Sequence, residues 1–134
     1  MKTVLFVCVH NAGRSQMAEA FFNSMAEGKA RAASAGTQPA DEVNPIAAKV
    51  MKEAYIDISG KKPKMLTLEM LQSAGRVITM GCGDDPAGIC PARIVETEDW
   101  DLEDPKGKSV EKVREIRDTI KAKVINLLKE MGIN

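Results

Sequence analysis

The feature that most constrains the fold is a run of four apolar residues near the start of the chain, VLFV at 4–7. Such a run is typical of a strand that is buried on both faces, because it leaves no position for a solvent-facing polar side chain. From Ser15 onward the chain is rich in Ala, Met and Glu, which have high helix propensity, until Gly28 provides a helix stop. We therefore expect a strand over residues 2–8 and a helix over residues 15–27.

The rest of the chain continues the alternation of strands and helices. Asn44 followed by Pro45 is typical of a helix start, with Asn as the N-cap and Pro in the first turn, and Ser109 caps a last helix whose apolar residues recur at helical spacing. The further elements expected are strands at 31–35, 76–80 and 93–95 and helices at 45–54, 68–72 and 110–131. This order predicts a parallel sheet with helices on both faces and a ligand site at the carboxyl ends of the strands.

The loop between the first strand and the first helix reads CVHNAGRS over residues 8–15 and has the character of an oxyanion site. A short loop from a buried strand into a helix directs its backbone N–H groups at one spot, where the helix N-terminus adds partial positive charge. Arg14 closes the loop, and its guanidinium can clamp two oxygens of a tetrahedral oxyanion. No Gly-Lys-Ser/Thr follows, so a nucleotide phosphate is not expected. The residues expected to surround the oxyanion are Val9, His10, Asn11, Ala12, Gly13 and Arg14.

Cys8 begins this loop, under the expected oxyanion. The positive field favours its thiolate, which is the nucleophilic form, and Ser15 is placed to donate a hydrogen bond to the sulfur. Asn11 and Gly13 are the loop residues that best tolerate a positive φ. A buried cysteine near a surface arginine is the ordinary interpretation of such a pair, but strand, loop and helix here agree on a nucleophile at an anion site.

Composition excludes several classes of function. The chain has 19 Lys and Arg against 19 Asp and Glu, so no global basic field favours nucleic acid or an acidic membrane surface. The apolar run at 4–9 is too short to cross a bilayer, and no cleavage site for a secretory signal follows it. Three cysteines in a chain without a signal favour reactive thiols in a reducing cytoplasm over a disulfide scaffold. We expect one cytoplasmic domain over residues 1–134.

A second informative segment, GCGDDPAGICP at 81–91, carries the other two cysteines, Cys82 and Cys90. Its glycines, prolines and aspartates predict a mobile loop. A zinc site is not expected, because the cysteine spacing is long and His10 is the only histidine. Cys82 follows a predicted strand on the rim that also carries Cys8, so the three thiols can exchange disulfides in series, although two idle surface cysteines would fit the same composition.

An acidic segment at 98–105 precedes the last helix. Acidic runs are usually solvated surface, but a carboxyl held over the loop could protonate a leaving oxygen. Composition alone leaves Asp101, Glu103 and Asp104 open for this role. The proline after Asp104 restricts that residue to extended backbone. Trp100 is interpreted as a packing anchor for the segment.

These segments together resemble the thioredoxin-coupled arsenate reductases, which share a fold with the low-molecular-weight protein tyrosine phosphatases. The resemblance covers nearly the whole chain and is carried by FVCVHNAGRSQMAEAF at 6–21, SAGT at 34–37, VNP at 43–45, the two later cysteines, and EDW and EDPKGKS within 98–109. It implies a single α/β domain of residues 1–134, a three-layer sandwich with a four-stranded parallel sheet in the order 2-1-3-4, helices on both faces, and a phosphotyrosine phosphatase I-like fold.

The resemblance implies an arsenate reductase that uses its three cysteines in turn. Cys8 attacks arsenic with Asp104 as the general acid, and Cys82 then attacks Cys8, which releases arsenite. Cys90 attacks Cys82, and thioredoxin or a similar dithiol protein reduces the resulting disulfide. No cofactor is implied, phosphate and sulfate are substrate analogues, and a monomer is expected. Seven residues separate Cys82 from Cys90 here, one more than in the reductases compared.

Two other functions remain open from the sequence. A low-molecular-weight tyrosine phosphatase would act through a Cys8 phosphoenzyme, and would need Arg14 and Asp104 but neither of the other thiols. Phosphatases of this fold usually carry aromatic residues after the Asp-Pro pair, where this chain has KGK at 106–108. A non-catalytic redox or anion sensor would show no turnover.

In some of the reductases that the chain resembles, a potassium ion lies beside the anion loop. Asn11, Glu19 and Ser34 match three of its ligands, but Lys64 stands where a further acidic ligand is expected. We therefore predict no metal, with Glu19 and Ser34 hydrogen-bonded to the loop instead. His10 is interpreted as a loop residue rather than a catalytic one, because no carboxylate partner for its ring is identifiable.

Overall fold

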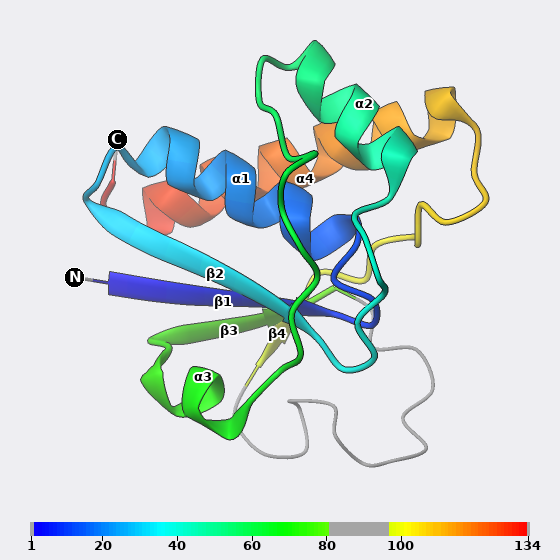
Figure 1. Ribbon diagram of the computed structural model, residues 1–134. Coiled ribbons are helices and arrows are strands. Elements are labelled where there is room, and N and C mark those ends of the chain that lie inside the picture. Colours follow the sequence, from blue (N-terminus) through cyan, green and yellow to red (C-terminus); the bar gives the residue numbers. More distant parts are fainter. Residues whose placement is uncertain (1, 81–96, 134) are drawn as a thin grey trace.

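The computed structural model describes residues 2–80 and 97–133. In these ranges strands and helices follow the order β-α-β-α-α-β-β-α (Figure 1). The strands are β1 (Lys2–Cys8), β2 (Ala30–Gly36), β3 (Arg76–Thr79) and β4 (Glu98–Asp99), and the helices are α1 (Arg14–Ala26), α2 (Pro45–Glu53), α3 (Leu68–Ser73) and α4 (Val110–Glu130). Within the described ranges, no helix combines the length and the apolar character needed to cross a bilayer.

The described strands form one parallel sheet in the order β2-β1-β3-β4, which confirms the expected topology. The central strand is β1, whose apolar residues 4–7 are all buried. The register pairs Cys8 with Gly36 of β2 and Val7 with Thr79 of β3. The carboxyl ends of these three strands therefore meet at one edge, where parallel sheets place their ligands.

The last strand differs from expectation. The strand expected at 93–95 lies outside the described residues, and β4 is formed by two residues that the sequence predicts to be loop. Glu98 is held against β3 because its carboxylate accepts hydrogen bonds from Arg76 Nε at 3.0 Å and Nη2 at 2.7 Å. Tertiary pairing thus overrides the low strand propensity of Glu and Asp, and the charged residues lie on the edge of the sheet.

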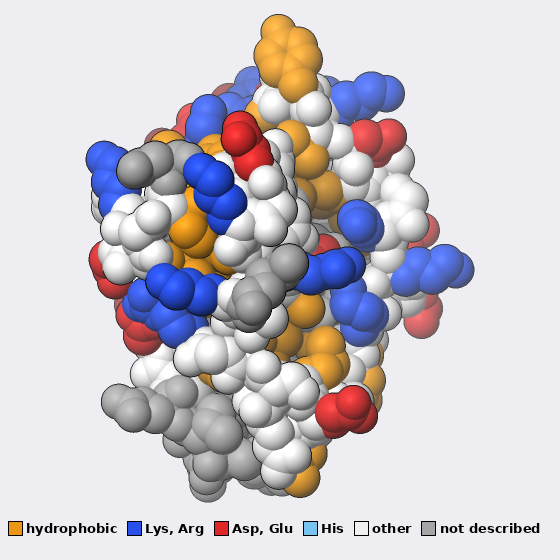
Figure 2. Space-filling view, turned by 90° about the vertical axis from the view of Figure 1, so that its left-hand side faces the viewer, with side chains coloured by type: hydrophobic (Ala, Val, Ile, Leu, Met, Phe, Trp, Pro, Cys, Tyr) orange, Lys and Arg blue, Asp and Glu red, His pale blue; other side chains and the backbone are white. Residues whose placement is uncertain are grey.

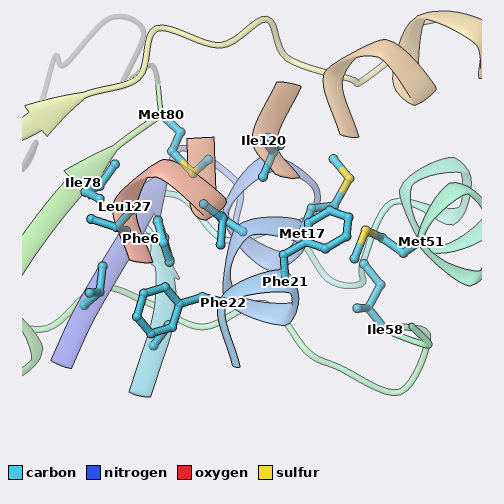
Figure 3. Packing of buried hydrophobic residues seen from close by; sticks show 14 of the residues in the cluster. Phe6, Met17, Phe21, Phe22, Met51, Ile58, Ile78, Met80, Ile120 and Leu127 are labelled. Carbon is cyan, nitrogen blue, oxygen red and sulfur yellow. The ribbon is translucent and has the colours of Figure 1, made fainter. Parts of the chain in front are cut away.

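Helices cover both faces of the sheet, but unequally (Figure 1). α1, α2 and α4 pack on one face over a large core that includes Phe6, Met17, Phe21, Phe22, Met51 and Ile120 (Figure 3). On the other face, α3 covers a smaller cluster of Leu5, Val7, Leu71 and Val77. Because successive side chains of a strand alternate between its faces, Phe6 and Cys8 both point into the large core.

The expected helix starts are confirmed. Asn44, Thr67 and Ser109 each accept a hydrogen bond from a backbone N–H group in the first turn of the helix that follows. The end of α2 is tied to α4 by Glu53, which accepts hydrogen bonds from Arg114 Nε at 2.9 Å and Nη2 at 2.8 Å. The hydrogen bonds and the charge of Arg114, with a smaller contribution from Arg117, lower the pKa of Glu53 from 4.5 to about 2.

The face at the amino ends of the strands carries intermingled charges. Figure 2 shows Lys and Arg side chains scattered among Asp and Glu side chains around exposed apolar atoms. This fits the formal net charge of zero. The loop at 8–15 lies at the opposite end of the sheet, where β1 ends (Figure 1).

Candidate active site

The Cys8 sulfur is buried and held by two donors. Only 2% of the residue is exposed. The Asn11 N–H donates to Cys8 Sγ at 3.2 Å, and Ser15 Oγ lies 2.8 Å from the same sulfur. Asn11 Nδ2 donates to Ser15 Oγ at 2.8 Å, so the serine hydroxyl proton is available for a Cys8 thiolate. The expected contact between Cys8 and Ser15 is confirmed, and such charge-assisted hydrogen bonds stabilise the thiolate.

Asn11 organises the loop with both its backbone and its side chain. Its φ is 50°, in the left-handed region that Asn tolerates, and the residue is fully buried. Its Oδ1 accepts hydrogen bonds from the Lys64 N–H at 2.8 Å and from Gln16 Nε2 at 3.1 Å. The positive φ expected at Asn11 is therefore present, and it is held by contacts from two other parts of the chain.

The backbone carbonyls of the loop are bound on its outer side. Those of Val9, His10 and Ala12 accept hydrogen bonds from N–H groups of the segment 38–44 at 2.8, 3.0 and 2.8 Å. In a planar trans peptide the C=O and the N–H of the following residue point in opposite directions. The N–H groups of His10, Asn11 and Gly13 therefore face away from the segment 38–44. One of them belongs to Asn11, and its hydrogen bond to the cysteine sulfur shows where they point. The loop therefore has the N–H geometry of an anion site.

Two further contacts fit the segment 36–38 against the loop. His10 Nδ1 lies 3.1 Å from the Gln38 carbonyl oxygen, which agrees with a role for this ring within the loop. A Cβ atom at Gly36 would lie 2.6 Å from the Val9 carbonyl oxygen. Any larger residue at Gly36 would therefore push the loop away from β2, a requirement that the sequence alone does not reveal.

Gly13 is required because of a close approach and not because of a positive φ. Its φ is −140°, so its tolerance of a positive φ is not used here. Instead, a Cβ atom here would lie 2.7 Å from Pro105 Cγ. The glycine lets the proline of the acidic segment rest on the start of α1, and this contact places the neighbouring Asp104 at the mouth of the loop.

Replacing Gly13 with alanine should therefore displace the acidic segment from the loop. We expect a loss of about 1–3 kcal/mol in the free energy of unfolding, the usual cost of an added methyl in a close-packed contact, and weaker sulfate binding. Thermal unfolding and calorimetric titration with sulfate measure the two effects. Gly60→Ala is the matched control, because a Cβ atom there meets no heavy atom within 4 Å. Equal behaviour of the two variants would contradict the packing role of Gly13.

Arg14 is held in place by carbonyl groups from two distant segments. Only 6% of the residue is exposed. Its Nη1 donates to the Met80 carbonyl at 2.6 Å and to the Leu102 carbonyl at 3.0 Å. Its Nη2 lies 3.8 Å from Asp104 Oδ2. The guanidinium is thus oriented before any ligand binds, and no sequence signal identifies the two carbonyls that orient it.

Among the three acidic candidates, Asp104 is the one placed at the loop. Its Oδ2 pairs with Arg14, and its Oδ1 accepts a hydrogen bond from the Lys106 N–H at 3.0 Å. Glu103 instead lies 3.5 Å from Lys108 Nζ and pairs with α4. Asp104 is also 44% exposed, so it can exchange protons with solvent. This geometry matches what a general acid at the mouth of the loop requires.

Cys82 and Cys90 lie outside the described residues. The structure describes the chain on either side of them. The carbonyl of Met80, two residues before Cys82, accepts a hydrogen bond from Arg14. Trp100 packs its ring 5.5 Å from that of Phe6, which confirms it as an anchor of the acidic segment.

The residues that match potassium ligands form a different arrangement. Ser34 Oγ donates to Glu19 Oε1 at 3.2 Å, so these two side chains bond to each other. Lys64 Nζ lies 3.8 Å from the same carboxylate oxygen. An ammonium group therefore stands where the resemblance calls for an acidic ligand, and the set does not fit a potassium ion. Within the described residues, no group of three or more His, Cys, Asp or Glu side chains could hold a metal.

Two relatives match the chain along almost its whole length. It is 40% identical over 132 residues to a protein of Halobacterium salinarum named putative arsenate reductase, covering 95% of this chain and 91% of that one. It is 37% identical over 135 residues to the glutaredoxin arsenate reductase of Synechocystis, covering 98% of this chain and 100% of that one.

Solved structures with the same fold include a reductase and a phosphatase. The thioredoxin-dependent arsenate reductase of Corynebacterium glutamicum is 37% identical with a TM-score of 0.81, covering 98% of this chain and 62% of that chain. The arginine phosphatase of Geobacillus stearothermophilus is 26% identical with a TM-score of 0.84, covering 98% of this chain and 94% of that chain. The model of the family described as low molecular weight phosphotyrosine protein phosphatase matches residues 3–134. The chain belongs to this family.

Proposed function

We propose that this protein reduces arsenate to arsenite, with Cys8 as the nucleophile. The observation that carries the proposal is the buried Cys8 sulfur, which contacts two hydrogen-bond donors beneath the loop. Arg14 and Asp104 form an ion pair at the opening of the same loop. The names of the relatives supply the substrate. Arsenate has the shape and charge of phosphate, so the same donors serve it, but its arsenic can also accept two electrons.

The first step forms a bond between sulfur and arsenic. The Cys8 thiolate attacks As(V), while Arg14 and the loop N–H groups hold the remaining oxygens. Asp104 donates a proton to the departing oxygen, which leaves as water. Ser15 and the Asn11 N–H stabilise the thiolate before the attack.

The second step reduces arsenic through a disulfide relay. The Cys82 thiolate attacks the Cys8 sulfur, and the bonding pair between sulfur and arsenic stays on arsenic, which leaves as arsenite. The resulting Cys8–Cys82 disulfide is attacked by Cys90, which frees Cys8 and forms a Cys82–Cys90 disulfide. Met80 lies two residues before Cys82, and its carbonyl accepts a hydrogen bond from Arg14 of the loop. This contact supports the access of the Cys82 thiol to the loop.

The electron donor is proposed to be thioredoxin or a similar dithiol protein. The names of the relatives point to two such donors, because one is a glutaredoxin arsenate reductase and another is thioredoxin-dependent. Thiol exchange of this kind needs a reducing compartment, so we place the enzyme in the cytoplasm, acting as a monomer.

Substrate preference tests the proposal against the phosphatase alternative. With a dithiol donor in excess, we expect kcat/KM for arsenite formation to exceed that for hydrolysis of p-nitrophenyl phosphate by about tenfold or more, since the KGK turn at 106–108 offers no aromatic wall. Cys8→Ser is the control and should lose both activities. Faster hydrolysis of the aryl phosphate would favour the phosphatase. Sulfate binding without turnover of either substrate would favour a sensor.

A further inference from the structure

A nearly buried carboxylate lies beside the anion loop and needs a counter-charge. Glu19 lies on α1 and is 7% exposed. Its Oε1 accepts a hydrogen bond from Ser34 Oγ, and Ser34 is fully buried. A neutral hydroxyl does not compensate a charge that is removed from water. An uncompensated negative charge here, five residues along the helix from Arg14, would also repel an oxyanion in the loop.

The surrounding polar groups increase this demand for positive charge. Gln16 Nε2 donates to Asn11 Oδ1 and to the Lys62 carbonyl. Its Oε1 is buried and accepts no hydrogen bond from the described residues. One buried oxygen in this region is therefore left without a hydrogen-bond donor among the described residues, and a nearby cation stabilises such an oxygen.

We propose that the Lys64 ammonium is a built-in cation that takes the place of a bound monovalent metal ion beside the anion loop. Its Nζ lies 3.8 Å from Glu19 Oε1. The proposal concerns the state of the loop and holds whether the loop acts on arsenate or on a phosphate ester.

The backbone of Lys64 is hydrogen-bonded beside the loop, and its side chain, which is 45% exposed, reaches Glu19 from there. The Lys64 N–H donates to Asn11 Oδ1 at 2.8 Å, and its carbonyl accepts a hydrogen bond from the Gly36 N–H at 2.8 Å. One residue thus binds the asparagine that shapes the loop and neutralises the glutamate behind it. Lys64 is a positioning residue, because it acts on the oxyanion through Asn11 and Glu19.

The test compares potassium chloride with choline chloride at matched ionic strength. The readouts are sulfate affinity by calorimetry and the midpoint of thermal unfolding, neither of which requires turnover. The wild type should give the same values in both salts. Lys64→Met should lose about tenfold in sulfate affinity in choline chloride, the loss expected from one unbalanced charge near the site, and should regain it in potassium chloride.

Three further variants separate charge from structure. Lys64→Arg keeps the charge and should resemble the wild type. Lys61→Met removes an exposed lysine three residues away and should respond equally to both salts. The double variant Glu19→Gln, Lys64→Met removes both charges and should lose the response to potassium.

Three outcomes would overturn the proposal. The first is a wild type that has a severalfold higher sulfate affinity, or a higher midpoint of thermal unfolding, in potassium chloride than in choline chloride. The second is a Lys64→Met variant that matches Lys61→Met in both salts. The third is a Lys64→Met variant whose loss potassium does not restore. If the wild type binds no sulfate at all, the anion loop itself is refuted, and the unfolding midpoints still decide the role of Lys64.

Discussion

Single substitutions of Cys82 and Cys90 should stop arsenate turnover at two different points. Cys82→Ser should stall with arsenic bonded to Cys8, because no thiol attacks the adduct. Cys90→Ser should release arsenite once and trap a Cys8–Cys82 disulfide, because no third thiol passes the oxidation outward. Sustained turnover should be lost in both. Intact-protein and peptide mass spectrometry after a single turnover distinguish the two states.

Hydrolysis of an aryl phosphate is the internal control for this pair of variants. A phosphoenzyme on Cys8 is resolved by water, so any basal phosphatase activity should survive both substitutions. Retention of that activity, with sulfate binding, would show that the loop is intact. Sustained arsenite production by the Cys82→Ser, Cys90→Ser double variant with thioredoxin would refute the relay, and would leave Cys8 to work with an external thiol.

Substituting Arg14 with lysine should lower kcat/KM for arsenate by about 10²–10³-fold, the usual effect of losing one preorganised donor to a developing oxyanion. A lysine keeps the positive charge but has no planar fork, so it cannot bond the Met80 and Leu102 carbonyls as the guanidinium does. Carbonyls left unpaired in this buried position should also lower the free energy of unfolding by about 1–3 kcal/mol. Steady-state kinetics and thermal unfolding measure the two losses.

Arg31→Lys is the matched control for this change, because Arg31 is exposed on β2, at a distance from the loop. It should leave kinetics and stability unchanged. If Arg14→Lys kept full kcat/KM while losing stability, the guanidinium would be a structural brace between segments and not part of the oxyanion site.

Much of the fold could be predicted from the sequence, because the relevant signals are local. The apolar run at 4–7 predicts the central strand, and Asn44 and Ser109 predict two helix starts that the structure confirms. β4 could not be predicted from Glu98 and Asp99, whose pairing with β3 depends on a distant arginine. The strand expected at 93–95 and the cysteines at 82 and 90 lie outside the described residues, and their roles stay predictions.

The candidate site divides in the same way. The spacing of Cys8, Arg14 and Ser15 within one loop predicted the contact between Cys8 and Ser15 correctly, because the three residues are close in sequence. Composition alone left Asp101, Glu103 and Asp104 open as the acid, and the resemblance selected Asp104; the structure adds the contact of Asp104 with Arg14. The reason for Gly13 needed the structure, because it is the approach of Pro105 from 92 residues further along the chain and not a left-handed backbone.

The sequence by itself determined the order of the strands and helices other than β4, and it predicted the anion loop with Cys8 as its nucleophile, since propensity, periodicity and loop chemistry act over a few neighbouring residues. Only the tertiary structure decided how the loop is held. It brought the Met80 and Leu102 carbonyls to Arg14, and the Lys64 ammonium to Glu19. These contacts join segments 45 to 88 residues apart, and they exist because the parallel sheet gathers the ends of separate strands at one edge.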